Sequence, residues 1–152
     1  MKNYLRNLAC LFALVATTLP GAAWSGEDPI YTSFFSSVAV SGYDVTSYFS
    51  EAQPIKGEKA FKTEYMDADW YFANQENLDK FIQNPQRYAP QYGGYCAWAV
   101  SQGDTASSDP LLWTIHEDKL YLNYNPEINT RWRSDKARLI VEADKNWPTV
   151  LN

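Results

Sequence analysis

The chain has few of the residues that usually carry metal binding or catalysis. Among its 152 residues there are two cysteines and one histidine. No nucleophile elbow, glycine-rich phosphate loop, metalloprotease helix or paired-cysteine redox motif occurs in it. Absence of these motifs does not exclude an enzyme, but the sequence favours a binding protein over a catalyst.

Basic residues are also scarce: Lys and Arg number 13 against 18 Asp and Glu. An acidic chain has no electrostatic footprint for nucleic acid or for an anionic membrane surface, so neither is expected as a partner. Lys2 and Arg6 precede an apolar run at residues 8–19, and small residues follow it. This pattern predicts a signal peptide at residues 1–25 that is cleaved on export of the protein, and the expected location is the periplasm. No later segment is apolar and long enough to span a bilayer.

Cleavage would remove Cys10 and leave Cys96 as the single cysteine. It lies in residues 91–100, QYGGYCAWAV, where two glycines precede an aromatic and aliphatic run typical of core. A lone cysteine in an oxidising compartment is buried and inert, bound to a ligand, or paired between chains.

The remaining pattern predicts a small single α+β domain at residues 38–152, after a leader at residues 26–37. A hairpin is expected at residues 59–73, with its turn at 66–69, and Asn74 caps a following helix. A second hairpin is expected at residues 112–123, and Asn125 then begins the first of two C-terminal helices. No internal repeat is evident.

Three stretches together resemble the exported branch of the YHS domain family: GYDVTSYF, WYFANQENLDKFIQNPQRYAPQYGGYCAWAV, and LYLN with ADKNWP. The resemblance implies an α+β fold built around a treble-clef-like β-hairpin plus helix. Metal-binding members of the wider group carry a Cys-x-x-x-Cys pair at the positions of Ala73 and Asn77. Since neither residue is a thiolate, a structural zinc site cannot be built there.

Five residues are candidates for binding a small ligand near the central stretch: Cys96, Asp44, Tyr43, Tyr95 and Trp98. Asp44 has an alternative role, because aspartate is favoured as the cap of a short helical turn. Cys96 with His116 and Met66 is a candidate set for Cu(I), since soft ligands suit that ion. His116 in a turn and Cys96 in the core are the competing structural interpretations.

Two functions follow from these observations. The leading hypothesis is a non-catalytic binding module for a soft metal such as copper, or for a small ligand, near Cys96. The alternative is a structural or protein-interaction module in which Cys96 is inert and an exposed aromatic surface binds a partner. A thiol-dependent enzyme using Cys96 with Asp44 or His116 ranks last.

Overall fold

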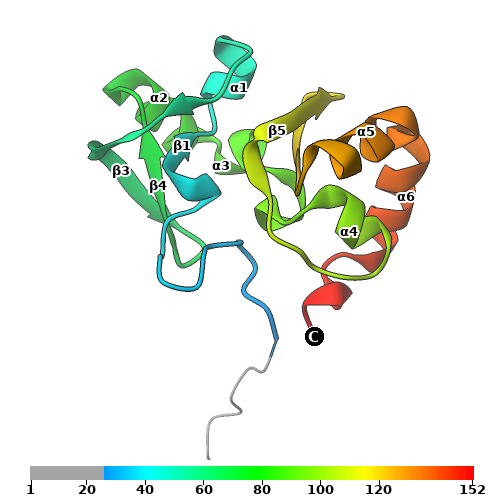
Figure 1. The fold of residues 1–152 in the computed structure, drawn as a ribbon. Coiled ribbons are helices and arrows are strands. Elements are labelled where there is room, and N and C mark those ends of the chain that lie inside the picture. The colour runs from blue at the N-terminus through cyan, green and yellow to red at the C-terminus, as the bar shows by residue number, and fades with distance from the viewer. Residues whose placement is uncertain (1–25) are drawn as a thin grey trace, which may run out of the picture.

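The computed structural model describes residues 26–152, so the predicted signal peptide lies outside the described residues. The chain forms three two-stranded antiparallel sheets with short helices between and after them (Figure 1). The shorter elements are η1 (Val40–Gly42), β1 (Tyr43–Asp44), α1 (Ser47–Ser50), β2 (Ile55–Lys56), α3 (Pro85–Tyr88), η2 (Gln91–Gly94), α4 (Ala97–Ser101) and η3 (Thr149–Leu151).

The predicted hairpin and helix are present as β3 (Glu58–Tyr65), β4 (Ala68–Phe72) and α2 (Gln75–Gln83). Alternate residues of β4 are buried, as expected of a strand with one face on the core. The Asn74 side chain accepts a hydrogen bond from the Asn77 N–H, which satisfies a free donor at the start of the helix. The turn is shorter than predicted, because the strands already pair at residues 65 and 68.

The second hairpin is β5 (Asp109–His116) with β6 (Lys119–Asn123), and α5 (Pro126–Ser134) follows it. The Asn125 side chain accepts from the Ile128 N–H, so the predicted cap is confirmed. The last long helix, α6, spans Lys136–Asn146. The predicted α+β class, with two longer hairpins and C-terminal helices, is therefore confirmed.

The two hairpin-helix units have the same arrangement of elements, which the sequence analysis did not predict. Adding 51 to the residue numbers of β3, β4 and α2 gives the bounds of β5, β6 and α5. Each ladder shifts register at the same place, between Glu58 and Lys62 in one and between Asp109 and Trp113 in the other. The expectation of no internal repeat is thus wrong, and we call the two units the first and second repeat.

Side-chain packing repeats as well. Trp70 on β4 packs against Phe81 on α2 with ring centroids 5.0 Å apart, and Tyr121 packs against Trp132 at 5.3 Å. Both pairs join the second strand of a hairpin to its helix. The residues differ because each core is filled by its own combination of aromatic volumes.

The second hairpin joins the two repeats into one domain. Leu120 and Leu122 on β6 belong to the hydrophobic core of the first repeat. Tyr121, which points to the opposite face, belongs to the core of the second repeat. Since β6 contributes to both cores, the two groups of elements seen side by side in Figure 1 share one interior.

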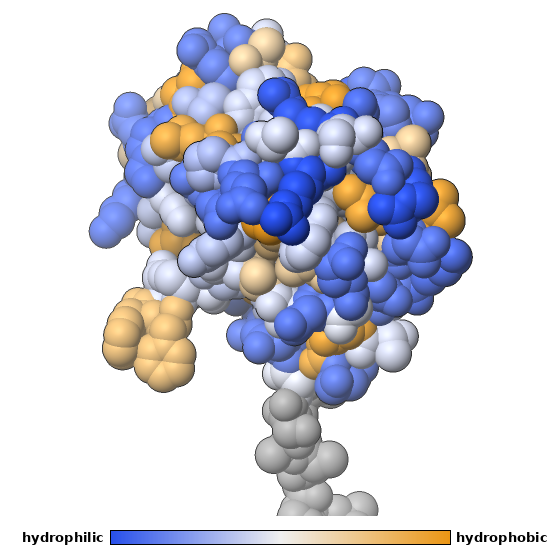
Figure 2. Space-filling model, turned by 45° about the vertical axis from the view of Figure 1, so that its right-hand side comes forward, coloured by the Kyte–Doolittle hydropathy of each residue, from blue (hydrophilic) through white to orange (hydrophobic). Residues whose placement is uncertain are grey.

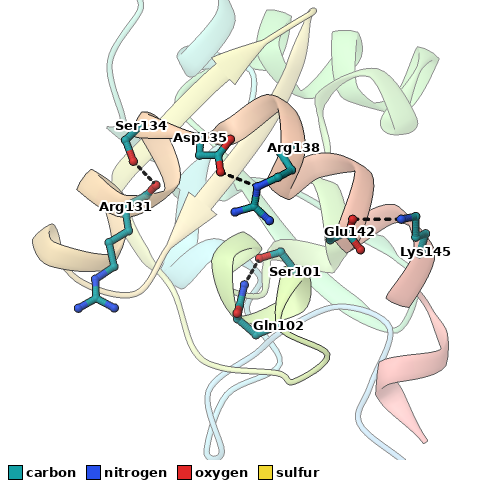
Figure 3. Close-up of polar contacts among 8 residues, drawn as sticks. All are labelled: Ser101, Gln102, Arg131, Ser134, Asp135, Arg138, Glu142 and Lys145. Carbon is teal, nitrogen blue, oxygen red and sulfur yellow. Dashed lines mark hydrogen bonds and ion pairs between the residues drawn. The ribbon is translucent and has the colours of Figure 1, made fainter.

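Polar contacts cover the outside of the C-terminal helices (Figure 3). Arg138 pairs with Asp135 at 2.6 Å and Lys145 with Glu142 at 3.0 Å, all with exposed side chains. Exposed pairs of this kind contribute at most about 1 kcal/mol each to stability, so α6 is held mainly by its buried face. Within residues 26–152, none of the helices has the length and apolar character that crossing a bilayer requires.

Candidate functional site

Each hairpin-helix unit is preceded by a tight turn whose backbone is left-handed, and we count these turns and the residue pairs after them as part of the repeats. The two turns lie 52 residues apart, one more than the hairpins, so Ser41, Tyr43 and Asp44 match Gly93, Tyr95 and Cys96. Val40, Ser41 and Gly42 have φ values of 50°, 50° and 78°, and Tyr92, Gly93 and Gly94 have 55°, 60° and 86°. A left-handed β-branched residue such as Val40 is a rare and costly conformation. Both turns deliver a Gly-Tyr pair and then a buried side chain, which is Asp44 in the first repeat and Cys96 in the second.

Asp44 is fully buried, and its carboxylate accepts four hydrogen bonds. One oxygen accepts from the N–H and the hydroxyl of Thr46, at 2.9 and 2.7 Å. The other accepts from the Ala73 N–H at 2.9 Å and the Asn77 amide at 2.7 Å. Thr46 and not Asp44 is the N-cap residue of α1, and the helix start has no side-chain cap, so the predicted capping role of Asp44 is wrong. Its contact with Thr46 is a turn two residues long that precedes the helix.

This network lies where metal-binding relatives were expected to hold a metal. Ala73 and Asn77 occupy the positions of their paired cysteines, and both donate to the same oxygen of Asp44. A carboxylate has about four lone-pair sites, so four donors saturate it. A cation would have to displace these donors, so the Asp44 carboxylate is fully used within the fold.

Cys96 is 1% exposed, and its Sγ lies 3.7 Å from the Asn123 Oδ1. Burial raises the pKa of the thiol, although the backbone N–H groups of Ala99, Tyr124 and Trp98 act in the opposite direction. A thiol with a raised pKa is mostly protonated at neutral pH and is a poor nucleophile and metal ligand. The geometry favours the inert interpretation of Cys96.

Asp44 and Cys96 are counterparts in the two repeats. The Ala73 N–H donates to Asp44, and the N–H of Tyr124, 51 residues further along, faces the sulfur of Cys96. The backbone pairing matches too: Asp44 pairs with Ile55, and the Cys96 N–H donates to the Ala106 carbonyl at 2.9 Å. The five candidate ligand residues thus form two separate sets rather than one site, Tyr43 and Asp44 in the first and Tyr95, Cys96 and Trp98 in the second.

The candidate copper ligands also lie apart. Cys96 bridges to Leu122, whereas His116 pairs with Lys119 at the far end of β6. Three residues of strand separate these partners, about 10 Å. Met66 lies in the turn of the first hairpin and is 48% exposed. Among the residues that the structure describes, no three His, Cys, Asp or Glu side chains are grouped as a metal site.

The most exposed apolar residues lie in the leader, and the sequence analysis did not single them out. Phe34 and Phe35 are 94% and 95% exposed, with their rings edge to face at 4.8 Å. Figure 2 shows a hydrophobic projection standing clear of the body of the molecule. The only sequence signal is the composition of SFFSS, two large apolar residues among serines with no partner at helical or strand spacing.

Beside this loop lies a hollow of about 470 Å³ lined by basic and polar residues. Its Lys56 Nζ donates to the Ser41 carbonyl at 2.6 Å and lies 4.4 Å from the centre of the Tyr43 ring. The remaining wall comes from the turn, from strands β3 and β4, and from the serines on either side of the phenylalanines: Ser33, Ser36, Val38, Gly42, Gly57, Lys59 and Tyr71.

Comparison with known families matches residues 46–92 to the YHS domain. This chain contains a YHS domain. The domain covers the first hairpin, α2 and α3 and ends at Tyr92, so Asp44 and Cys96 lie just outside it and most of the second repeat lies beyond it. Searches of curated proteins and of solved structures gave no significant match.

Proposed function

We propose that this YHS domain protein is an exported, non-catalytic module that binds a protein partner through Phe34 and Phe35. The observation that carries the proposal is the almost complete exposure of two adjacent phenylalanines in a folded chain. Burying one such side chain contributes about 1.5–3 kcal/mol, so leaving two in water is unfavourable unless a partner covers them.

The charges around the pair indicate what kind of surface fits it. Phe34 and Phe35 share a hollow of about 520 Å³ with the acidic residues Glu27, Asp28 and Asp67. An anionic membrane would be repelled by these carboxylates. A protein pocket with an apolar floor and a basic rim satisfies both features, because it buries the rings and pairs the acids.

The interior of the protein supports binding at the surface rather than near Cys96. Both counterpart side chains, Asp44 and Cys96, are buried and already in contact with neighbouring groups. Neither presents a free ligand atom to a metal or a small molecule. The soft-metal hypothesis, which the sequence analysis placed first, therefore has no observation in its favour among the described residues.

Site-specific photo-crosslinking in the native host tests the proposal. A photoreactive phenylalanine analogue at position 35 should yield discrete adducts, whose partner is identified by mass spectrometry. The matched control carries the same analogue at Val141, a residue of α6 that is 52% exposed. The Phe34→Ser and Phe35→Ser double variant should abolish co-purification of the partner found.

The outcomes separate the interpretations. Adducts from position 35 but not from position 141 support an interaction surface at the loop. Adducts of equal yield from both positions, or from neither, contradict the proposal. An adduct of twice the chain mass would identify the partner as a second copy.

A further inference from the structure

The turn of the second repeat is covered by the N-terminal segment of the chain, residues 27–31. The Tyr31 N–H donates to the Gly93 carbonyl at 2.9 Å, and the Tyr95 hydroxyl donates to the Asp28 carbonyl at the same distance. The two backbones approach so closely that a Cβ on Gly93 would lie 1.9 Å from the Pro29 carbonyl oxygen. The second repeat thus binds a peptide segment across its left-handed turn, and that segment bends at Pro29 and Ile30.

In the first repeat the corresponding turn borders the open hollow. Ser41 occupies the position of Gly93, and its carbonyl accepts from the Lys56 Nζ instead of from a peptide N–H. Tyr43 occupies the position of Tyr95 and lies half-buried beneath the same ammonium group. The first repeat therefore has the same backbone acceptor as the second, with a lysine in place of the peptide and a tyrosine ring beneath that lysine.

We propose that this hollow binds an acidic segment of a partner polypeptide, as the second repeat binds residues 27–31. A backbone N–H of the segment replaces the Lys56 Nζ at the Ser41 carbonyl, and the Tyr43 hydroxyl donates to a carbonyl of the segment. Lys56, once released, pairs with an acidic side chain. The inference rests on the proposed function only for the claim that the ligand is a polypeptide.

The charge of the hollow sets the preference for an acidic segment. Lys56 and Lys59 both line it, in a chain whose net charge is −5. The corresponding residues of the second repeat, 51 positions on, are the uncharged Ser107 and Pro110. The two lysines are thus specific to the repeat whose hollow is open, and they supply the complement to a carboxylate.

The replacement of Gly93 by Ser41 determines how closely a bound segment can approach the turn of the first repeat. Gly93 has no side chain, and the carbonyl of Pro29 occupies the space where one would lie. Ser41 carries a hydroxymethyl group there and lines the hollow. The bound segment must lie further from the turn than Pro29 does, and the Ser41 hydroxyl can donate to its carbonyl across that gap.

The test is a titration of the isotope-labelled mature chain with two peptides, followed by amide chemical shifts. The probe is acetyl-EDPIY-amide, which copies residues 27–31, and the control is the neutral acetyl-QNPIY-amide. We expect the acidic peptide to shift Ser41, Gly42 and Gly57, with an affinity that falls at least about tenfold in Lys56→Glu. Added salt should weaken binding further, because the lysines are exposed.

Two further variants keep the test independent of any single one that misfolds. Tyr43→Phe removes only the hydroxyl and should weaken binding several-fold at unchanged charge. Lys136→Glu, at the start of α6, changes the net charge equally and should leave binding unaffected.

Three results would overturn the inference: no shifts at millimolar peptide, equal binding of the neutral peptide, or shifts confined to Gly93 and Gly94. The last would mean that the probe displaces the chain's own segment. Binding of the acidic peptide must also survive the Phe34→Ser and Phe35→Ser double variant, because the lysine hollow does not need those rings. Crosslinking at position 35 and peptide binding at the hollow can therefore fail separately.

Discussion

The Asp44 network yields the sharpest stability prediction. In Asp44→Asn the amide oxygen can still accept from the N–H and hydroxyl of Thr46. Its NH₂ group then faces the Ala73 N–H and the Asn77 amide, which now donate to the second carboxylate oxygen at 2.9 and 2.7 Å. Two hydrogen bonds to a charged acceptor are lost, each worth about 1.5–3 kcal/mol.

Part of this loss is recoverable, which fixes the expected magnitude. The Asn77 side chain can flip and present its oxygen to Asn at position 44, whereas the Ala73 N–H has no such freedom. We expect the free energy of unfolding to fall by about 2–4 kcal/mol, a large share of the 5–15 kcal/mol typical of a domain. With a urea dependence of about 2 kcal/mol per molar, the midpoint falls by about 1–2 M.

The assay is urea unfolding followed by tryptophan fluorescence. Asp79→Asn is the matched control, because Asp79 is exposed on α2 and accepts only a surface hydrogen bond from Gln75. Its effect should stay within about 0.5 kcal/mol. If Asp44→Asn unfolds at the same urea concentration as this control, the network does not hold the first repeat together and the reasoning is refuted.

Three other predictions follow. Alkylation of Cys96 in the native protein should be slowed about 10³-fold or more relative to the denatured protein, since labelling requires opening that costs about 5 kcal/mol or more; rapid native labelling would contradict its burial. Burial raises the pKa of Tyr48, so this residue contributes stability that is complete below about pH 10 and is lost as the pH rises further. In Tyr48→Phe the free energy of unfolding should therefore fall less steeply with alkaline pH, by about 1.4 kcal/mol per pH unit. An unchanged slope would refute this. Gly93→Ala should release the N-terminal segment to proteolysis because its Cβ meets the Pro29 carbonyl, whereas Gly103→Ala, also at positive φ but with its nearest neighbour at 3.9 Å, should not; equal cleavage of both variants would count against the clash.

Local signals explain why the hairpins and helices could be predicted. Asn74 and Asn125 each follow a strand and cap a helix, and the side-chain contact involved spans three residues. Such short-range chemistry is visible in a sequence. The central stretch was also predicted as core, and its residues Tyr92, Tyr95 and Cys96 are buried.

The repeat escaped prediction because packing conserves shape rather than residue type. Trp70 corresponds to Tyr121 and Phe81 to Trp132, so the matching core positions share aromatic character but no identity. A few scattered identities mark the duplication in the sequence: the helix caps, the Gly-Tyr pairs before Asp44 and Cys96, and single residues such as Asp67 and Asp118 in the hairpin turns. So few matches do not establish a repeat without coordinates.

The site was missed for a different reason, which is that its parts are distant in sequence. Asp44 meets Asn77 across 33 residues, and the Lys56 hollow combines the leader with two hairpin strands. Strand alternation and helical spacing of apolar residues describe single elements and do not indicate which elements come into contact. The sequence analysis placed Asp44 and Cys96 in one candidate site, whereas the structure puts them at equivalent places in two repeats.

Comparison of the two repeats also accounts for where the proposed binding surface lies. The second repeat has its left-handed turn covered by the chain itself, at Pro29 and Tyr31, and its interior position is a thiol that makes little contact with solvent. The first repeat keeps the same turn uncovered and fills its interior position with a saturated carboxylate, so its free chemistry lies outside, on Lys56 and Lys59. Asp44 and Cys96 are both enclosed by their own contacts, and this enclosure is why we place the proposed recognition at the surface beside the leader.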